Sequence, residues 1–353
     1  METMVAFWKN KKVLITGHTG FKGSWLALWL KQLQANVVGY ALDPPTPTNL
    51  YTVAKVAEGL VDVRGDVRDA ALLQQTIATH QPDIIFHLAA QPLVRFSYAN
   101  PVETYAINVM GTVNVLEAAR QLGRACTIVN ITTDKCYENK ERQLGYQEED
   151  SLGGYDPYSN SKGCAELVTS AYRQSYFARA KERIGVASAR AGNVIGGGDW
   201  AEDRLLPDLV TACAKAERIK IRYPHAIRPW QHVLEPLSGY LRLAECLYQQ
   251  PDHYAEAWNF GPNDGEAKSV AWIADEVIQR WGGKSRWEQV ESQVVHEATY
   301  LTLNCTKARE KLQWQPKWTI QQALQATIAW YQAFYRDDDM QALTLKQIRE
   351  YLE

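Results

Sequence analysis

Short apolar runs alternate with helical patterns through the first half of the chain, and this alternation restricts the fold more than any other feature. Continuous apolar runs are typical of strands buried on both faces of a parallel sheet. They predict strands at 12–15, 36–40, 59–63, 83–88, 126–131 and 185–190, and the helical patterns predict helices at 22–33, 70–79, 101–122 and 158–178. The sequence therefore predicts an α/β fold with a doubly wound parallel sheet of the Rossmann type.

The pattern changes at about residue 196, where glycines and prolines precede mixed helices and short strands rich in tryptophan and arginine. In doubly wound enzymes such a segment commonly covers the carboxyl edge of the sheet and supplies the substrate pocket. We expect a Rossmann domain at 1–192, to which a helical segment at about 231–260 returns. Residues 193–230 and 261–353 are predicted to form a smaller mixed α/β C-terminal domain that binds the substrate.

Composition argues against several classes of protein. The formal charge of -2 gives no reason to expect binding to nucleic acid or to a membrane surface. No run approaches the roughly 18 apolar residues of a membrane span, and the N-terminus lacks a signal-peptide pattern. The six cysteines are scattered and show no metal-ligand spacing. Such cysteines are typically neutral thiols in a reducing compartment. We expect a cytoplasmic protein without a metal site.

Three glycines, Gly17, Gly20 and Gly23, lie between the first strand and the first helix. A dinucleotide pyrophosphate needs close backbone approach and a helix N-terminus at that position. Asp43, just after the second strand, and Asp66, after the third, fit recognition of the adenosine or, alternatively, the capping of a loop. No lysine or arginine occurs from 32 to 54, so a 2′-phosphate would find no local cation, and the sequence favours NAD over NADP.

Polar side chains that suit proton transfer follow the fifth strand and begin the last helix of the first domain. Tyr158 and Lys162 are four residues apart and therefore share one helix face, where an ammonium is expected to lower the pKa of a phenol. Thr133, Asp134 and Lys135 come directly after the strand at 126–131. A Y-x-x-x-K pair alone is commonplace, but chance rarely combines it with a nucleotide fold and a strand-end hydroxyl.

These motifs resemble those of the extended short-chain dehydrogenases/reductases over almost the full length of the chain. The matching segments are TGHTGFKG, GDV, HLAAQP, NVMGTVNVLEAA, TTDK, YSNSK and RPWQHV. Within that superfamily the chain is similar to the nucleotide-sugar 4,6-dehydratases. The segments TGHTGFKGSW, TTDKCYEN and RAGNVIGGGDW resemble most closely the group that acts on CDP-glucose.

The resemblance implies 4,6-dehydration of CDP-D-glucose to CDP-4-dehydro-6-deoxy-D-glucose, in the biosynthesis of deoxysugars. Hydride passes from C4 to NAD and returns to C6, so the reaction needs no net oxidant. GDP-mannose and dTDP-glucose remain alternative substrates. A nucleotide-sugar 4-epimerase and a non-catalytic protein that senses dinucleotides are the alternative functions.

The resemblance also implies the roles of individual side chains. Tyr158 is the base for O4, Lys162 supports it, and Thr133 orients O4. Asp134 protonates the departing C6 hydroxyl, provided that burial keeps it protonated. Lys135 replaces the glutamate of many related dehydratases and is either the C5 base or a charged group that stabilises the enolate.

Further residues follow by the same correspondence. The implied cofactor-binding residues are Gly17, Thr19, Gly20, Phe21, Lys22, Gly23, Asp43, Asp66, Val67, Leu88, Ala89, Ala90, Thr132, Tyr158 and Lys162. The implied substrate-binding residues are Gln91, Asn193, Arg204 and Arg228. The helices at 101–122 and 158–178 correspond to those that pair across a twofold axis in this superfamily, so a homodimer or homotetramer is expected.

Overall fold

The computed structural model describes residues 2–179, 182–263, 265–290 and 300–353. Its centre is a seven-stranded sheet in the order β11-β6-β5-β4-β1-β2-β3, and every neighbouring pair is parallel. The strands are β1 (Lys12–Thr16), β2 (Asn36–Ala41), β3 (Val61–Arg64), β4 (Ile84–His87), β5 (Cys126–Ile131), β6 (Ile184–Arg190) and β11 (Ala257–Asn259). The predicted doubly wound α/β fold is confirmed, and β11 is a seventh strand that the sequence analysis did not predict.

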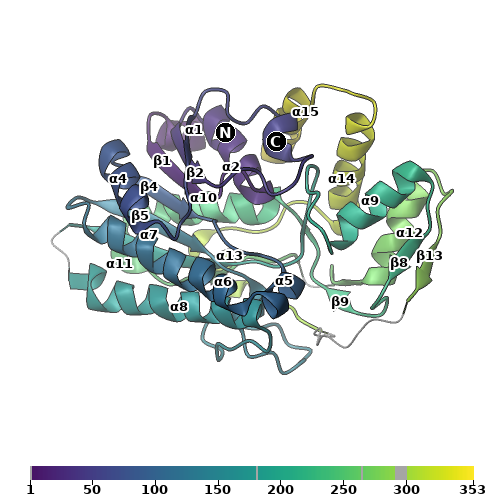
Figure 1. Ribbon diagram of the computed structural model, residues 1–353. Helices are drawn as coiled ribbons and strands as arrows, with labels where there is room; N and C mark the ends of the chain where they lie inside the picture. The colour runs from purple at the N-terminus through teal and green to yellow at the C-terminus, as the bar shows by residue number, and fades with distance from the viewer. Residues whose placement is uncertain (1, 180–181, 264, 291–299) are drawn as a thin grey trace.

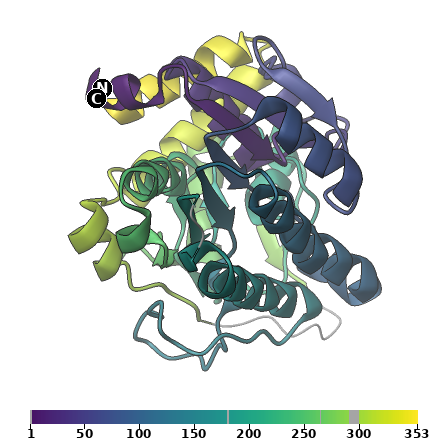
Figure 2. The same cartoon turned by 90° about the vertical axis from the view of Figure 1, so that its left-hand side faces the viewer.

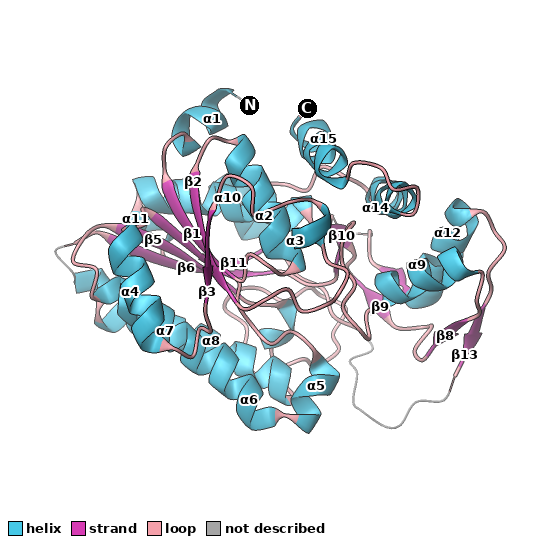
Figure 3. Ribbon diagram, turned by 45° about the horizontal axis from the view of Figure 1, so that its top comes forward, coloured by secondary structure: helices cyan, strands magenta, loops and turns pink. Residues whose placement is uncertain are grey.

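Helices cover both faces of the sheet because successive strand residues point to opposite sides. Val13 and Ile15 pack toward α2 (Phe21–Gln32) and α10 (Leu234–Gln249). Leu14 packs on the opposite face toward the second layer of helices, which lies on the other side of the sheet in Figure 3. That layer contains α4 (Ala70–His80), α7 (Gly111–Arg120) and α8 (Pro157–Ser175).

The predicted helix at 101–122 is one continuous segment with a change of winding in its middle. It consists of α6 (Pro101–Tyr105), a π-helical turn (Ala106–Met110) and α7. A short helix that was not predicted, α5 (Val94–Ala99), precedes it. The remaining short elements of this half are α1 (Glu2–Trp8), α3 (Leu50–Val53) and the 3-10 turns Asp134–Cys136 and Phe177–Arg179.

The segment after β6 forms a second lobe beside the carboxyl edge of the sheet, on the right of Figure 1. Its two-stranded sheets pair β7 (Val194–Ile195) with β10 (Gln231–His232), β8 (Ile219–Ile221) with β13 (Trp287–Gln289), and β9 (Ile227–Arg228) with β12 (Lys268–Ser269). Its helices are α9 (Leu205–Lys215), α12 (Val270–Trp281) and α14 (Ile320–Phe334), whereas α13 (Thr306–Leu312) packs against α10 and β11.

Other parts of the chain also return from this lobe to the first. The predicted returning helix is present as α10, but it ends at Gln249, and α11 (Pro251–Tyr254) and β11 follow it. The last helix, α15 (Met340–Leu352), packs against α2, where Tyr351 and Trp29 lie 5.7 Å apart between ring centroids. The two ends of the chain therefore lie near each other, as Figures 1 and 2 show. The division into domains stays a prediction. The helix α15 belongs to the segment predicted as the C-terminal domain, and it contacts α2 of the first lobe.

Candidate active site

A cleft of about 1060 Å³ lies between the carboxyl ends of the central strands and the second lobe. It brings together the glycine turn after β1, the strand end after β5, the start of α8 and the second-lobe arginines. With one exception, all predicted catalytic, cofactor-binding and substrate-binding residues line it. The sequence motifs thus converge on one site.

The glycine turn needs bare backbone at two of its three positions. Gly17 has a φ of +80°, and a Cβ there would lie 2.7 Å from the Ala89 nitrogen. A Cβ at Gly23 would lie 2.1 Å from the Gly17 oxygen. No side chain caps the start of α2, because its N-cap residue is Gly20. The first amides of this helix are therefore suited to bind an anion such as a pyrophosphate.

The two candidate adenosine contacts differ in their surroundings. Asp66 pairs with Arg68, with 2.6 Å between Oδ2 and Nη2. The Asp43 side chain is 91% exposed at the rim of the cleft, and its Oδ1 lies 3.7 Å from Nε of Arg64. Arg64 belongs to β3, so the prediction that no cation lies near this ribose position was wrong. Residues 32–54 contain no such cation, and the neighbouring strand supplies it instead.

The candidate acid and base residues lie on a tight turn at the end of β5. Thr133 is the N-cap of the 3-10 turn Asp134–Cys136, and its hydroxyl donates to Oδ1 of Asp134 at 3.0 Å. The Asp134 side chain is buried, and Oδ2 has no hydrogen-bond partner among the described residues. A Cβ at Gly192 would stand 1.8 Å from that oxygen, so the carboxyl group fits only against a glycine. Lys135 is half-buried beside it in the cleft.

Tyr158 and Lys162 project from the first two turns of α8, which Asp156 caps through the Ser159 amide. Both side chains are buried. Burial raises the pKa of Tyr158 to about 12, the Asp134 charge acts in the same direction, and a hydrogen bond with Thr133 opposes them. Burial lowers the pKa of Lys162 to about 8. The predicted lowering of the Tyr158 pKa by a nearby ammonium was thus wrong for the protein without its cofactor, because the effect of burial is larger.

Lys22, a candidate cofactor-binding residue in the first turn of α2, lines the cleft. Its Nζ donates to the Tyr240 hydroxyl at 3.5 Å. Burial and the charges of Arg204 and Lys162 lower its pKa to about 7, against the opposing charge of Asp134. This candidate cofactor residue therefore belongs electrostatically to the reaction centre.

The second lobe supplies cations to the cleft. Arg204 forms an ion pair with Asp199 at 2.8 Å, and Arg228 is buried with Nη1 donating to the Ile227 carbonyl at 2.9 Å. Asn193 adopts a left-handed φ of 48° at the bend after β6. Such a conformation is unfavourable for most residues and often marks a functional position.

Gln91 is the exception among the predicted residues, because it does not line the cleft. Its buried side-chain amide donates to Thr104 Oγ1 at 2.9 Å and to the Leu93 carbonyl at 3.1 Å, and it accepts from the Leu93 amide at 2.5 Å. These bonds occupy the polar atoms that a substrate would need. The structure thus gives Gln91 a role in holding the loop after β4.

Sequence reasoning missed other cations that line the cleft, namely Arg95, Lys220 and Arg222. Arg222 pairs with Asp203 at 2.8 Å. For Lys220 and Arg222 the available signal was the segment KIRYPHAIRPW, in which lysine and arginines recur within ten residues. In the part of the chain that the structure describes, no group of three or more His, Cys, Asp or Glu side chains is suited to a metal ion, and no helix is long and apolar enough to cross a membrane.

Comparison with known proteins agrees with this arrangement. Residues 14–327 match the family model described as GDP-mannose 4,6 dehydratase. CDP-glucose 4,6-dehydratase of Salmonella typhimurium is 50% identical over 349 residues, which cover 98% of this chain and 97% of that protein.

Solved structures share the fold. Epimerase Mth375 of Methanothermobacter thermautotrophicus has a TM-score of 0.80 at 22% identity and covers 99% of this chain, with 97% of its own chain matched. The dTDP-glucose 4,6-dehydratase of Bacillus anthracis, solved in complex with NAD, has a TM-score of 0.75 at 23% identity and covers 91% of this chain, with 96% of its own matched. The chain therefore belongs to the GDP-mannose 4,6 dehydratase family and, within it, to the nucleotide-sugar 4,6-dehydratases.

Proposed function

We propose that the protein converts CDP-glucose to CDP-4-dehydro-6-deoxyglucose with NAD as the resident cofactor. The observation that carries this proposal is the convergence of the glycine turn, the Thr-Asp-Lys turn and the Tyr–Lys pair on one cleft. The choice of CDP-glucose rests on the 50% identity to the Salmonella enzyme over nearly the whole chain.

The residues present fit a dinucleotide. Gly17 and Gly23 keep the backbone open where side chains would collide, and the uncapped start of α2 offers amides to the pyrophosphate. Asp43 at the rim suits a ribose hydroxyl. When bound, NAD supplies the hydride acceptor for C4 and the hydride donor for C6.

Tyr158 is the proposed base that takes the proton from O4, and Thr133 holds that oxygen. The burial that raises the pKa of Tyr158 makes the phenolate costly in the protein alone. A second positive charge beside the phenol, in addition to Lys162, therefore favours proton removal. Oxidised NAD, when bound, would supply such a positive charge.

Asp134 and Lys135 are the proposed acid and base for loss of water. Lys135 takes the C5 proton, the Asp134 carboxyl group gives a proton to the C6 hydroxyl, and water leaves across the C5–C6 bond. Hydride return to C6 and proton return to C5 complete the product. The net reaction is therefore loss of one water molecule without consumption of the cofactor.

Arg204, Arg228 and Asn193 are the proposed contacts of the substrate pyrophosphate. Guanidinium groups match phosphate oxygens in charge and in geometry. Arg204 keeps its charge beside Asp199, since that carboxylate raises its pKa. The cytoplasmic location expected from the sequence stays a prediction.

The protein is further proposed to form a homodimer or homotetramer through α6, the following π-helical turn and α8. Val102 (83% exposed), Met110 and Leu167 present apolar side chains to solvent along these helices. Exposed apolar groups on neighbouring helices favour contact with a second copy. Sedimentation equilibrium of the wild type and of Val102→Glu with Leu167→Glu tests this assembly.

The test of the proposed function is a proton NMR time course in D2O with CDP-glucose, dTDP-glucose and GDP-mannose in parallel. We expect a new C6 methyl signal and deuterium at C5 with CDP-glucose alone. Conversion of another sugar nucleotide would change the substrate. Inversion at C4 without a methyl signal would replace the dehydratase by an epimerase, and no turnover by an NAD-bound preparation would favour a binding protein.

A further inference from the structure

The turn that carries Thr133, Asp134 and Lys135 is held at both of its ends. Thr132 lies immediately before these residues, and Tyr137 follows them after one intervening residue. Both flanking side chains are buried and point to the same ion pair, Glu166 with Arg190.

Glu166 holds the first end. The Thr132 hydroxyl donates to Oε1 of Glu166 at 2.5 Å, and the Ser188 hydroxyl donates to Oε2 at 2.6 Å. Arg190 Nη2 donates to Oε2 at 2.8 Å. Burial disfavours the carboxylate, but the Arg190 charge and these hydrogen bonds outweigh it and hold the pKa of Glu166 below its ordinary value.

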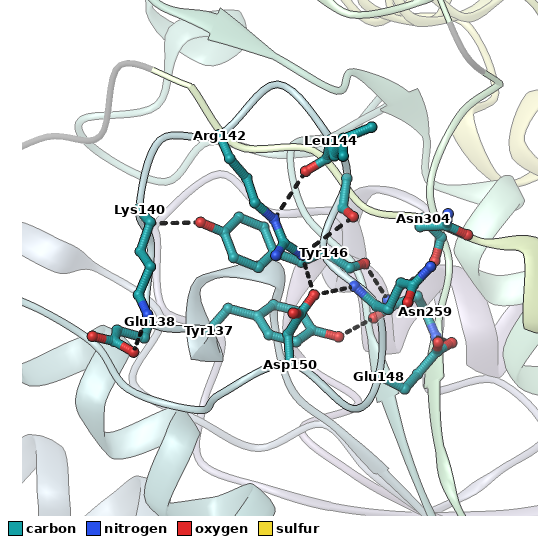
Figure 4. Close-up of polar contacts among 12 residues, drawn as sticks. Tyr137, Glu138, Lys140, Arg142, Leu144, Tyr146, Glu148, Asp150, Asn259 and Asn304 are labelled. Atoms are coloured by element: carbon teal, nitrogen blue, oxygen red, sulfur yellow. Dashed lines mark hydrogen bonds and ion pairs between the residues drawn. The ribbon is translucent and has the colours of Figure 1, made fainter.

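Arg190 holds the second end. Its Nη1 donates to the Tyr137 hydroxyl at 2.7 Å, and that hydroxyl donates to Oδ1 of Asn259 at 2.8 Å. Figure 4 shows this contact between Tyr137 and Asn259, with the ring of Tyr146 stacked on Tyr137. The two charges of one ion pair thus fix the two ends of the same short turn.

Glu166 also acts on the Tyr–Lys pair, because it lies four residues beyond Lys162 on the same helix face. The charge of Glu166 opposes the effect of burial on the pKa of Lys162. Other titratable groups of the described residues also face Lys162, namely Cys136 from the turn, His87 from β4 and Lys22 from α2. Burial keeps Cys136 and His87 uncharged at neutral pH by raising the first pKa and lowering the second to about 3, whereas a Lys22 ammonium repels Lys162.

We propose that Glu166 and Arg190 are positioning residues for the dehydration: they fix the Thr-Asp-Lys turn relative to α8, and Glu166 maintains the ammonium form of Lys162. Neither residue lines the cleft, so both act through Thr132, Tyr137 and Lys162. This inference rests on the proposed function.

The charge effect is tested with Glu166→Gln, which keeps the shape and removes the charge. A nearby opposite charge shifts a pKa by about one to three units. Loss of the Glu166 charge should therefore lower the pKa of Lys162 and move the alkaline limb of the pH profile of kcat to lower pH by about one unit or more. Ser188→Ala is the matched control, because it removes a hydrogen bond to Glu166 and keeps the charge. Its alkaline limb is expected to match that of the wild type. Equal alkaline limbs for Glu166→Gln and the wild type would overturn the charge effect.

The positioning effect is tested with Tyr137→Phe, which does not depend on whether Glu166→Gln folds. Tyr146→Phe is the control, because it also removes a buried hydroxyl from this loop but does not touch Arg190. We expect Tyr137→Phe to lower kcat about tenfold, with KM for CDP-glucose within about twofold of the wild type. Tyr146→Phe should leave kcat unchanged, whereas equal kcat values for the two variants would contradict the positioning role.

Hydrogen exchange of residues 132–137, followed by mass spectrometry without substrate, separates this inference from the proposed function. Tyr137→Phe is expected to exchange these amides faster than Tyr146→Phe. A wild type that exchanges as expected but does not convert CDP-glucose would refute the proposed function alone. Equal exchange in the two variants would overturn the positioning of the turn, whatever the substrate.

Discussion

Substitution of Gly192 by alanine gives a direct test of the role of Asp134. The added Cβ would stand 1.8 Å from Oδ2 and 2.1 Å from Cγ of Asp134, whereas carbon atoms in ordinary contact lie about 3.5 Å apart. The buried carboxyl group must therefore withdraw by more than about 1 Å, which breaks its alignment with the Thr133 hydroxyl.

The expected loss follows from that displacement. A misplacement of about 1 Å costs roughly 100-fold in rate, and loss of a general acid costs about 10² to 10⁴. We therefore expect Gly192→Ala to lower kcat for product formation at least about 100-fold. Oxidation at C4 does not need Asp134, so the absorbance of reduced nicotinamide should accumulate after CDP-glucose is added.

Gly261→Ala serves as the control, because a Cβ there would meet only the Cys305 sulfur at 3.3 Å and the Leu303 side chain at 3.5 Å and beyond. Its kcat should stay within about twofold of the wild type. A Gly192→Ala enzyme that releases product at the wild-type rate, with no accumulation of reduced cofactor, would refute the role assigned to Asp134.

Three further predictions concern other parts of the molecule. Lys135→Met should slow exchange of the C5 proton at least about 100-fold by NMR in D2O, and near-normal exchange would assign the base elsewhere. Asp43→Ala should weaken NAD binding and improve relative binding of NADP, because Arg64 remains; an unchanged ratio of the two dissociation constants would contradict this. Burial lowers the pKa of His87 and of His232 from 6.5 to about 3. The unfolded chain therefore binds more protons below pH 6.5, and stability should fall from there toward pH 3, by about 2 kcal/mol per histidine at pH 5. Urea unfolding at pH 7 and pH 5 measures the difference in the free energy of unfolding, and equal values at the two pH values would contradict the prediction.

The central sheet was predictable because its long strands are continuous apolar runs. The seventh strand was not, since β11 has three residues and directly follows Pro251–Tyr254 and a short connection. The helix predicted over this stretch ends at Gln249, where a proline two residues later prevents its continuation. Short edge strands depend on pairing with a neighbour, here β6, and this pairing has no local signal.

Most candidate site residues were predictable because they follow strand ends in sequence, and the carboxyl ends of parallel strands meet at one edge of the sheet. Arg64 was missed because it reaches Asp43 from the neighbouring strand, 21 residues further along the chain. The ion pair of Glu166 with Arg190 joins α8 to β6, and the local sequence around neither residue predicts it. Gln91 was placed in the substrate site by its motif, whereas its hydrogen bonds hold a loop.

The measurement that tests the central claim most directly follows deuterium from C4 of CDP-glucose into the product. CDP-glucose with deuterium at C4 is converted in ordinary water, and the product is examined by NMR and mass spectrometry. Internal hydride transfer predicts one deuterium in the C6 methyl group and none lost to solvent. Deuterium that is lost to solvent, or retained at an inverted C4, would contradict a 4,6-dehydration by internal hydride transfer.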